Sequence, residues 1–262
     1  MHDLISQWRT WLAACGRPAS TIRLRTHQIL RFSDHHPDLA AVTATDMVAW
    51  LAQPGWAANT RRSNHAALRS FYGWAHAFGH VATDESRRLV SVKVPPPTPR
   101  PAPESVVKRG LLAAAPREHL MVELAARMGL RRGEIARIHT RDVVEDLVGW
   151  SLRVHGKGAK VRVVPMPDHL ADLIRSKPDG WLFPSRTGGH LTEGHVGVLI
   201  ARALPHGWTA HTLRHRFATT AYAGTRDLLA VQALLGHSRP ETTRGYVQLP
   251  QDALRAAIAA AA

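Results

Sequence analysis

Apolar residues recur every three or four positions through residues 1–91, and polar or glycine-containing breaks divide them into four runs. That interval matches the repeat of an α-helix, so each run predicts an amphipathic helix. Ser20, Thr45 and Asn59 are the predicted N-caps, and Gly79 is the predicted stop of the fourth helix. The four runs cover residues 4–14, 20–36, 43–53 and 59–79. Residues 1–91 are therefore predicted to form a small helical bundle.

Residues 92–104, VKVPPPTPRPAPE, interrupt this pattern with six prolines. Proline is excluded from helix and sheet interiors, so the segment predicts a linker between two domains. Such a chain extends by about 3.1 Å per residue and spans on the order of 30 Å. The linker is therefore long enough for two domains to bind opposite sides of a large ligand.

The pattern in residues 105–262 is mixed. Short apolar runs on either side of Gly156 and Gly158 predict a β-hairpin over residues 149–167. The helical runs cover residues 104–115, 117–129, 192–204, 211–223, 225–236 and 251–262. The predicted fold class is mainly α with a small antiparallel β-sheet in the C-terminal domain.

Charge narrows the choice of partner. The chain has a formal net charge of +14 and a pI near 11.3, which is typical of proteins that bind a polyanion such as nucleic acid. Only five of its 34 basic residues are Lys, so a biased genome is a competing explanation. The single cysteine, Cys15, excludes an internal disulfide framework and a cysteine-based zinc site. Since no run resembles a membrane span or a signal peptide, we expect a cytoplasmic protein.

The motifs exclude a metal site and a nucleotide-binding loop. His211 and His215 have the spacing of a metal pair, but the glutamate of HExxH is missing. The segment HGKGAK, residues 155–160, does not have the order of a nucleotide-binding loop. Because no acidic cluster is suited to Mg²⁺ either, we expect no metal and no cofactor, and any phosphate chemistry must use cationic side chains.

Four segments together provide such cations: GLRRGEI at 129–135, GKGAKVRVVP at 156–165, HTLRH at 211–215 and LLGHSRPETTRGYV at 234–247. In this order and spacing they resemble the catalytic domain of the tyrosine recombinases, the phage integrase and Xer family. The resemblance covers about residues 105–250, and the helical bundle resembles that family's core-binding domain. The matched catalytic positions are Arg131, Lys157, His211, Arg214, His237 and Tyr246.

Each position has chemistry suited to a phosphodiester. Arginine forks bind phosphate oxygens in pairs, so Arg131 and Arg214 are expected to clamp the charge that develops on the phosphate. The resemblance makes Tyr246 the nucleophile, with a 3′-phosphotyrosyl intermediate that conserves bond energy without ATP. Lys157 would protonate the leaving 5′ oxygen. His211 would shuttle a proton or orient the phosphate, and His237 would donate to it.

Other residues near these motifs are assigned supporting or structural roles. Glu134 is expected to support Arg131. Tyr72 and Tyr222 lie in apolar helical patterns and are interpreted as packing residues. His215 and Arg216 are either phosphate contacts or part of a solvated face.

The fourth predicted helix has a basic side and an apolar side. Leu68, Phe71, Tyr72 and Ala75 form the apolar side, and the opposite face is either solvated or in contact with a DNA groove. The DNA-binding predictions are Arg61, Arg62, His65 and Arg69 on this helix, and Lys160 and Arg162 on the hairpin.

The resemblance implies a two-domain DNA recombinase: a core-type DNA-binding domain over 1–91, a linker over 92–104 and a catalytic domain over 105–262. It would act on double-stranded DNA at a short core site, as a homotetramer on synapsed DNA. The helix over 251–262 would dock on a neighbouring protomer or, alternatively, on its own. The expected function is integration of a phage or mobile-element genome, near the nucleoid or in the cytoplasm of a phage's host. The alternatives are a Xer-type dimer resolvase, a type IB topoisomerase and a non-catalytic DNA-binding protein.

Overall fold

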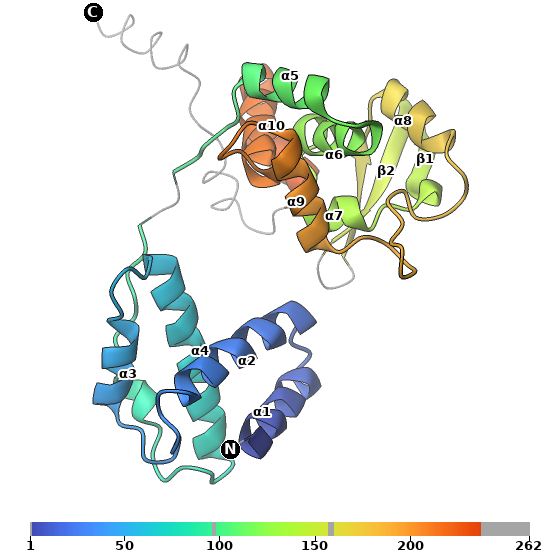
Figure 1. The fold of residues 1–262 in the computed structure, drawn as a ribbon. Helices are drawn as coiled ribbons and strands as arrows, with labels where there is room; N and C mark the ends of the chain where they lie inside the picture. The colour runs from blue at the N-terminus through green and yellow to red at the C-terminus, as the bar shows by residue number, and fades with distance from the viewer. Residues whose placement is uncertain (1, 96–97, 157–159, 237–262) are drawn as a thin grey trace, which may run out of the picture. The chain divides into compact units, whose positions relative to one another are not determined.

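The computed structural model describes residues 2–95, 98–156 and 160–236. The chain divides into two compact units, Met1–Pro96 and Pro97–Ala262, and the division falls inside the proline-rich segment (Figure 1). The described part is mainly helical, with one small antiparallel sheet in the second unit, as the sequence predicted. Within the described residues, no helix is both long and apolar enough to cross a bilayer.

The first unit is a helical bundle whose four predicted helices are confirmed. Trp8 lies in its core with no exposed surface. The ring of Trp8 packs edge-on against the ring of Phe71, with 5.3 Å between the ring centroids. The predicted apolar side of the fourth helix is buried in this core. The helices are α1 (His2–Ala14), α2 (Ala19–Ser33), α3 (Ala44–Leu51) and α4 (Ala58–Ala77), followed by the 3₁₀ turn η1 (Glu85–Arg88).

The N-terminal ends of α2, α3 and α4 differ from the predicted N-caps. The N-caps are Pro18, Thr43 and Ala57, so the predicted caps were wrong. In α3, Thr43 exchanges hydrogen bonds with Asp46 three residues later, and that carboxylate accepts from the Thr43 backbone N–H over 2.9 Å. Local side-chain pairing therefore places the N-cap of α3 two residues before the predicted cap, Thr45.

The predicted stop of α4 is confirmed. Gly79 has a φ of +75°, and its N–H donates to the carbonyl of His76. The N–H of His80 donates to the carbonyl of Ala75 over 2.8 Å. This pair of bonds is the Schellman arrangement, which requires a left-handed residue and so favours glycine.

The second unit contains a three-stranded antiparallel sheet of order β1-β2-β3. The predicted hairpin is confirmed as β2 (Gly149–His155) and β3 (Val161–Pro165), with Leu152 opposite Val164 on the buried face. The third strand, β1 (Val143–Asp146), was not predicted. Its four residues are too few and too exposed to produce a clear alternation.

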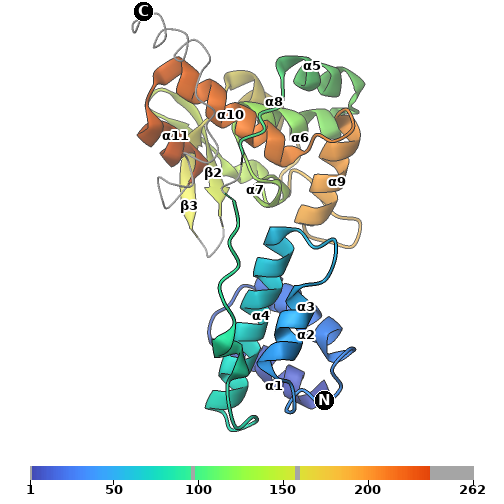
Figure 2. The ribbon, with the colours of Figure 1, turned by 90° about the vertical axis from the view of Figure 1, so that its left-hand side faces the viewer.

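Helices enclose the core of this unit. Helix α6 packs against α10, and α7 packs against α9 (Figures 1 and 2). The short helices α7 and α8 were not predicted, whereas the other five within the described residues were. These seven helices are α5 (Glu104–Ala113), α6 (Pro116–Arg127), α7 (Arg132–Ala136), α8 (Asp168–Arg175), α9 (Glu193–Ala203), α10 (Ala210–Thr225) and α11 (Leu228–Leu235).

Candidate active site

A buried carboxylate, that of Glu134 on α7, is the centre of the site. Its side chain is only 2% exposed. One oxygen, Oε2, accepts from the backbone N–H of Arg131 over 2.8 Å, and Oε1 accepts from the Arg131 Nη1 over 2.7 Å. These two bonds close the first turn of α7 and fix Arg131 at its start. The predicted pairing of Glu134 with Arg131 is therefore present.

Arg162 of β3 also binds this carboxylate, and its guanidinium does so with two parallel bonds. Nη1 donates to Oε1 of Glu134 over 2.8 Å and Nη2 donates to Oε2 over 3.0 Å. Burial alone would raise the pKa of Glu134, but the bonds and charge of Arg162, and then of Arg131, lower this pKa to about 2. The carboxylate is therefore ionised at neutral pH.

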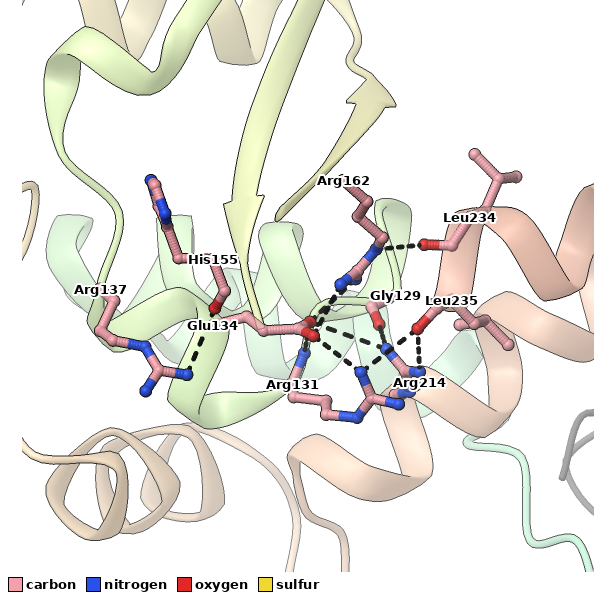
Figure 3. Close-up of polar contacts among 9 residues, drawn as sticks. All are labelled: Gly129, Arg131, Glu134, Arg137, His155, Arg162, Arg214, Leu234 and Leu235. Atoms are coloured by element: carbon pink, nitrogen blue, oxygen red, sulfur yellow. Dashed lines mark hydrogen bonds and ion pairs between the residues drawn. The ribbon is translucent and has the colours of Figure 1, made fainter. Parts of the chain in front are cut away.

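Arg214 of α10 also reaches this cluster, and Figure 3 shows it next to Gly129 and Leu235. Its Nη1 donates to the carbonyl oxygen of Gly129 over 2.5 Å and lies 3.8 Å from Oε2 of Glu134. Its Nη2 donates to the carbonyl oxygen of Leu235 over 2.7 Å. The side chain is 1% exposed, whereas that of Arg131 is 42% exposed. The two clamp residues thus lie together, one buried and one open to solvent.

The arginines meet at the C-terminal end of α11. Nη1 of Arg131 donates to the carbonyl oxygen of Leu235 over 3.3 Å, and Nε of Arg162 donates to that of Leu234 over 2.9 Å (Figure 3). The last carbonyls of a helix have no partner within the helix and carry partial negative charge. Three cationic side chains satisfy them here.

His211 lies on the exposed side of α10, beside this cluster. Burial by neighbouring protein, followed by the charges of Arg214, Arg131 and Arg132, lowers its pKa below the ordinary value of 6.5. Its Nε2 lies 3.1 Å from Nε2 of His215. His211 is therefore suited to accept a proton as a neutral imidazole at neutral pH.

The solvated-face interpretation of His215 was wrong. His215 is 5% exposed and lies inside the unit. Arg216 is partly buried and forms an ion pair with Glu104 of α5. Both side chains are therefore engaged within the protein in this structure.

Three predicted catalytic residues, Lys157, His237 and Tyr246, lie outside the described residues. The other two tyrosines are confirmed as packing residues. Tyr72 is 1% exposed, its hydroxyl donates to the carbonyl of Leu39 over 3.1 Å, and burial raises its pKa above the ordinary value. Tyr222 is half-buried against a small apolar cluster between α10 and α11.

The predicted DNA contacts have different environments. On α4, Arg61 donates to the carbonyl of Leu51 over 3.1 Å and Arg69 donates to that of Ser86 over 3.0 Å. His65 is half-buried, and its Nε2 has no hydrogen-bond partner among the described residues. Arg62 is exposed. On the hairpin, Lys160 is exposed, whereas Arg162 faces Glu134.

Sequence reasoning did not assign a role to Gly129 or place Arg162 inside the site. Gly129 has a φ of +64°, and an added Cβ would lie 2.4 Å from Cδ1 of Phe217. The signal for Arg162 was its register, since Arg162 and the buried Val164 lie two residues apart and so share one face of β3. The described residues contain no cluster of three or more side chains suited to hold a metal ion.

Comparison with known proteins agrees with this geometry. Residues 106–252 match the model of the phage integrase family. The tyrosine recombinase XerA of Thermococcus kodakarensis is 32% identical over 98% of this chain and 94% of its own. Solved structures share the fold as well. A lambda integrase (75–356) dimer bound to a COC′ core site has a TM-score of 0.77 and 20% identity over 95% of each chain. A lambda integrase tetramer bound to a Holliday junction has a TM-score of 0.73 and 21% identity over 91% of this chain and 77% of that one.

The family match covers more than half of the chain, and the XerA relative spans nearly all of it. The relative is named for the same chemistry that the cluster of Arg131, Arg214 and His211 suits. The chain therefore belongs to the phage integrase family, and it is a site-specific tyrosine recombinase that transfers DNA strands.

Proposed function

We propose that this recombinase cleaves and rejoins DNA through a 3′-phosphotyrosyl bond to Tyr246. The observation that carries the proposal is the convergence of Arg131 and Arg214, from α7 and α10, on one carboxylate beside the end of α11. The segment with His237 and Tyr246 follows α11 directly in the chain. Cations that stabilise phosphate charge therefore lie at the point from which the nucleophile segment begins.

In the proposed reaction, the Tyr246 hydroxyl oxygen attacks the phosphorus of one phosphodiester. The bond from phosphorus to the 5′ oxygen breaks, and a phosphotyrosine bond to the 3′ end replaces it. His211, neutral because its pKa is lowered, accepts the tyrosine proton. Lys157 supplies a proton to the leaving 5′ oxygen, and His237 donates a hydrogen bond to the phosphate. The reverse reaction with another strand's 5′ hydroxyl completes the exchange, so ATP is not needed.

Arg131 and Arg214 are proposed to share the phosphate unequally. Arg131 has the exposed side chain and so is the arginine that a phosphate meets first. Arg214 is buried and already donates to two carbonyls, so it contributes its positive charge from the buried side of the site. Two guanidiniums at such short range stabilise the dianionic character of a phosphodiester under attack.

We also propose that the enzyme works on double-stranded DNA at a short core site and as a homotetramer. The lambda integrase structures with a core site and with a Holliday junction support this arrangement, and the net charge of +14 favours DNA as partner. The proposed DNA contacts of the first unit are Arg61, Arg62, His65 and Arg69, with Lys160 on the hairpin. Residues 251–262 are proposed to dock on a neighbouring protomer. Deletion of residues 250–262 should then abolish assembly of the tetramer on DNA, and unchanged synapsis would rule the docking out.

The proposed biological role is integration of a phage or mobile-element genome. Xer-type resolution of dimers is the second candidate, and the XerA relative of nearly equal length favours it. The two roles differ in where the target site lies. Two target sites, one at the end of the mobile element and one at its insertion point, indicate integration. A single target site on the replicon indicates dimer resolution.

Capture of the covalent intermediate tests the proposal. Cells that express the protein are lysed in SDS, DNA attached to protein is recovered, and its ends are sequenced. Tyr246→Phe is the test variant, and Tyr222→Phe is the matched control because Tyr222 packs against an apolar cluster. We expect adducts clustered at one site that disappear only in Tyr246→Phe. Scattered adducts that depend on Tyr246 would indicate a topoisomerase, and no excess over Tyr246→Phe would indicate a non-catalytic DNA-binding protein.

A further inference from the structure

Arg162 occupies a position from which one guanidinium joins three elements. Its backbone belongs to β3, its two terminal nitrogens bind Glu134 of α7, and its Nε binds the carbonyl of Leu234 in the last turn of α11. All three bonds are between 2.8 and 3.0 Å. The side chain is 16% exposed. Because all three guanidinium nitrogens already donate hydrogen bonds within the protein, few N–H groups of Arg162 are left for a ligand.

The carboxylate that Arg162 holds is the one that positions Arg131. Glu134 binds both the backbone and the guanidinium of Arg131, so a rotation of the carboxylate would move Arg131 with it. Without the two bonds from Arg162, the oxygens of Glu134 would be free to turn toward Arg131 or Arg214 alone. Arg162 therefore determines which way the carboxylate faces.

Gly236 shows how closely Arg162 lies against the end of α11. Gly236 has a φ of +62°, and an added Cβ would lie 3.0 Å from Cδ and 3.1 Å from Nη1 of Arg162. Glycine at this position thus meets two demands: it ends α11 in the left-handed conformation and leaves room for the arginine. The glycine of the LGH segment is explained by this contact.

We propose that Arg162 is a positioning residue that holds Glu134 and the end of α11 in register, and that it does not contact DNA. This inference rests on the proposed function, since the groups it positions are the proposed phosphate clamp and the helix that precedes the nucleophile segment. The expected DNA contact of Arg162 is replaced by this role. Lys160, two residues earlier and exposed, keeps the DNA contact on this hairpin.

The first test measures structure and DNA binding without catalysis, in the full-length chain. The variants are Arg162→Gln, the milder Arg162→Lys, and Lys160→Gln as the control in the same hairpin. Hydrogen exchange of residues 231–236 should become about tenfold faster in both Arg162 variants and remain unchanged in the control, since Lys cannot form all three bonds. Binding to a nonspecific duplex is measured at several salt concentrations, and the salt slope is the slope of log Kobs against log salt concentration. The control should lose about one unit of this slope, while both Arg162 variants keep the wild-type slope and affinity.

The second test measures adduct formation in a single turnover, on the DNA site identified by capture. Both Arg162 variants should form adducts on the order of 100-fold more slowly at saturating protein, with unchanged DNA affinity. In a Glu134→Gln background the Arg162 substitutions should cost little more, because they act through that carboxylate. A loss that adds fully to that of Glu134→Gln would overturn positioning through Glu134.

The outcomes separate this inference from the proposed function. If wild-type protein forms no adduct, the proposed function fails, and hydrogen exchange with duplex binding still decides the role of Arg162. If wild-type protein forms adducts but Arg162→Lys matches it in rate and exchange, the positioning role is wrong. A loss of salt slope in Arg162→Gln equal to that in Lys160→Gln would instead make Arg162 a DNA contact.

Discussion

Nη2 of Arg214 donates to the carbonyl oxygen of Leu235 over 2.7 Å, so a proposed catalytic cation supports the last residue of α11. The same guanidinium also donates to the carbonyl of Gly129, which precedes Arg131 by two residues. Arg214 therefore connects the turn before one clamp arginine to the helix before the nucleophile segment. The stability of the fold and the proposed catalytic role therefore rest on the same side chain at this position.

The two clamp arginines should consequently differ in their effect on folding. Arg214→Lys is expected to destabilise the protein by about 3 kcal/mol, because a lysine cannot satisfy both carbonyls and leaves buried groups unpaired. Arg131→Lys should cost roughly 1 kcal/mol, since that side chain is 42% exposed. Both variants should lose adduct formation. Denaturant unfolding measures the difference, and equal losses of stability would contradict the buried role of Arg214.

The ionisation of Glu134 predicts a pH dependence of stability. Its pKa in the folded protein is about 2, below the ordinary 4.5, so its contribution to stability is complete above about pH 4.5 and is lost as the pH falls toward 2. Glu134→Gln should therefore lower the free energy of unfolding by about 3 kcal/mol at pH 7. The difference from wild type should shrink between pH 5 and pH 2.

Unfolding by urea at several pH values measures this difference. Glu145→Gln is the control, since Glu145 on β1 is exposed, and it should change stability by less than about 0.5 kcal/mol. A difference for Glu134→Gln that stays constant down to pH 2 would show that the carboxylate is not held by its arginines.

Gly129 should tolerate no side chain. Gly129→Ala combines a left-handed backbone, at about 1 to 2 kcal/mol, with a Cβ 2.4 Å from Phe217. The carbonyl that Arg214 uses would also move, so slower adduct formation should accompany the loss of stability. Gly189→Ala separates the two causes, because Gly189 has a φ of +67° and open space around it. Equal destabilisation of the two variants would mean that the contact with Phe217 adds nothing.

His211 predicts the pH profile of the reaction. Its lowered pKa keeps the imidazole neutral at pH 7, so adduct formation should fall only below pH 6.5 as the imidazole becomes protonated. Arg132 is one of the charges that lower this pKa, so Arg132→Gln should move the acid limb to higher pH. Arg186→Gln, an exposed arginine that is not among those charges, should leave the limb in place. Single-turnover rates from pH 5 to pH 8 measure the limb, and an unchanged limb in His211→Gln would assign it to another group.

Local pattern was sufficient for much of the fold. Helix α4 was predicted within two residues because its apolar side and its Gly79 stop are both properties of neighbouring residues. The five-residue α7 was not predicted, because it spans little more than one helical turn. Helix α8 was also missed, although Leu170, Ala171 and Ile174 are spaced as on one helical face. Short elements carry too few periods for the pattern to separate them from loops.

The amino-acid sequence by itself determined which chemical groups are proposed to act on a phosphodiester, because motif order and spacing predict Arg131, His211 and Arg214 without any coordinates. Only the tertiary structure decided which of the cationic groups are buried, which are exposed and what each one contacts. It turned Arg162 inward onto Glu134, buried Arg214 and left Arg131 exposed. The bonds from Arg162 to Glu134 and from Arg131 to Leu235 join residues 28 and 104 positions apart, and such separations are set by the packing of whole elements and not by local propensity.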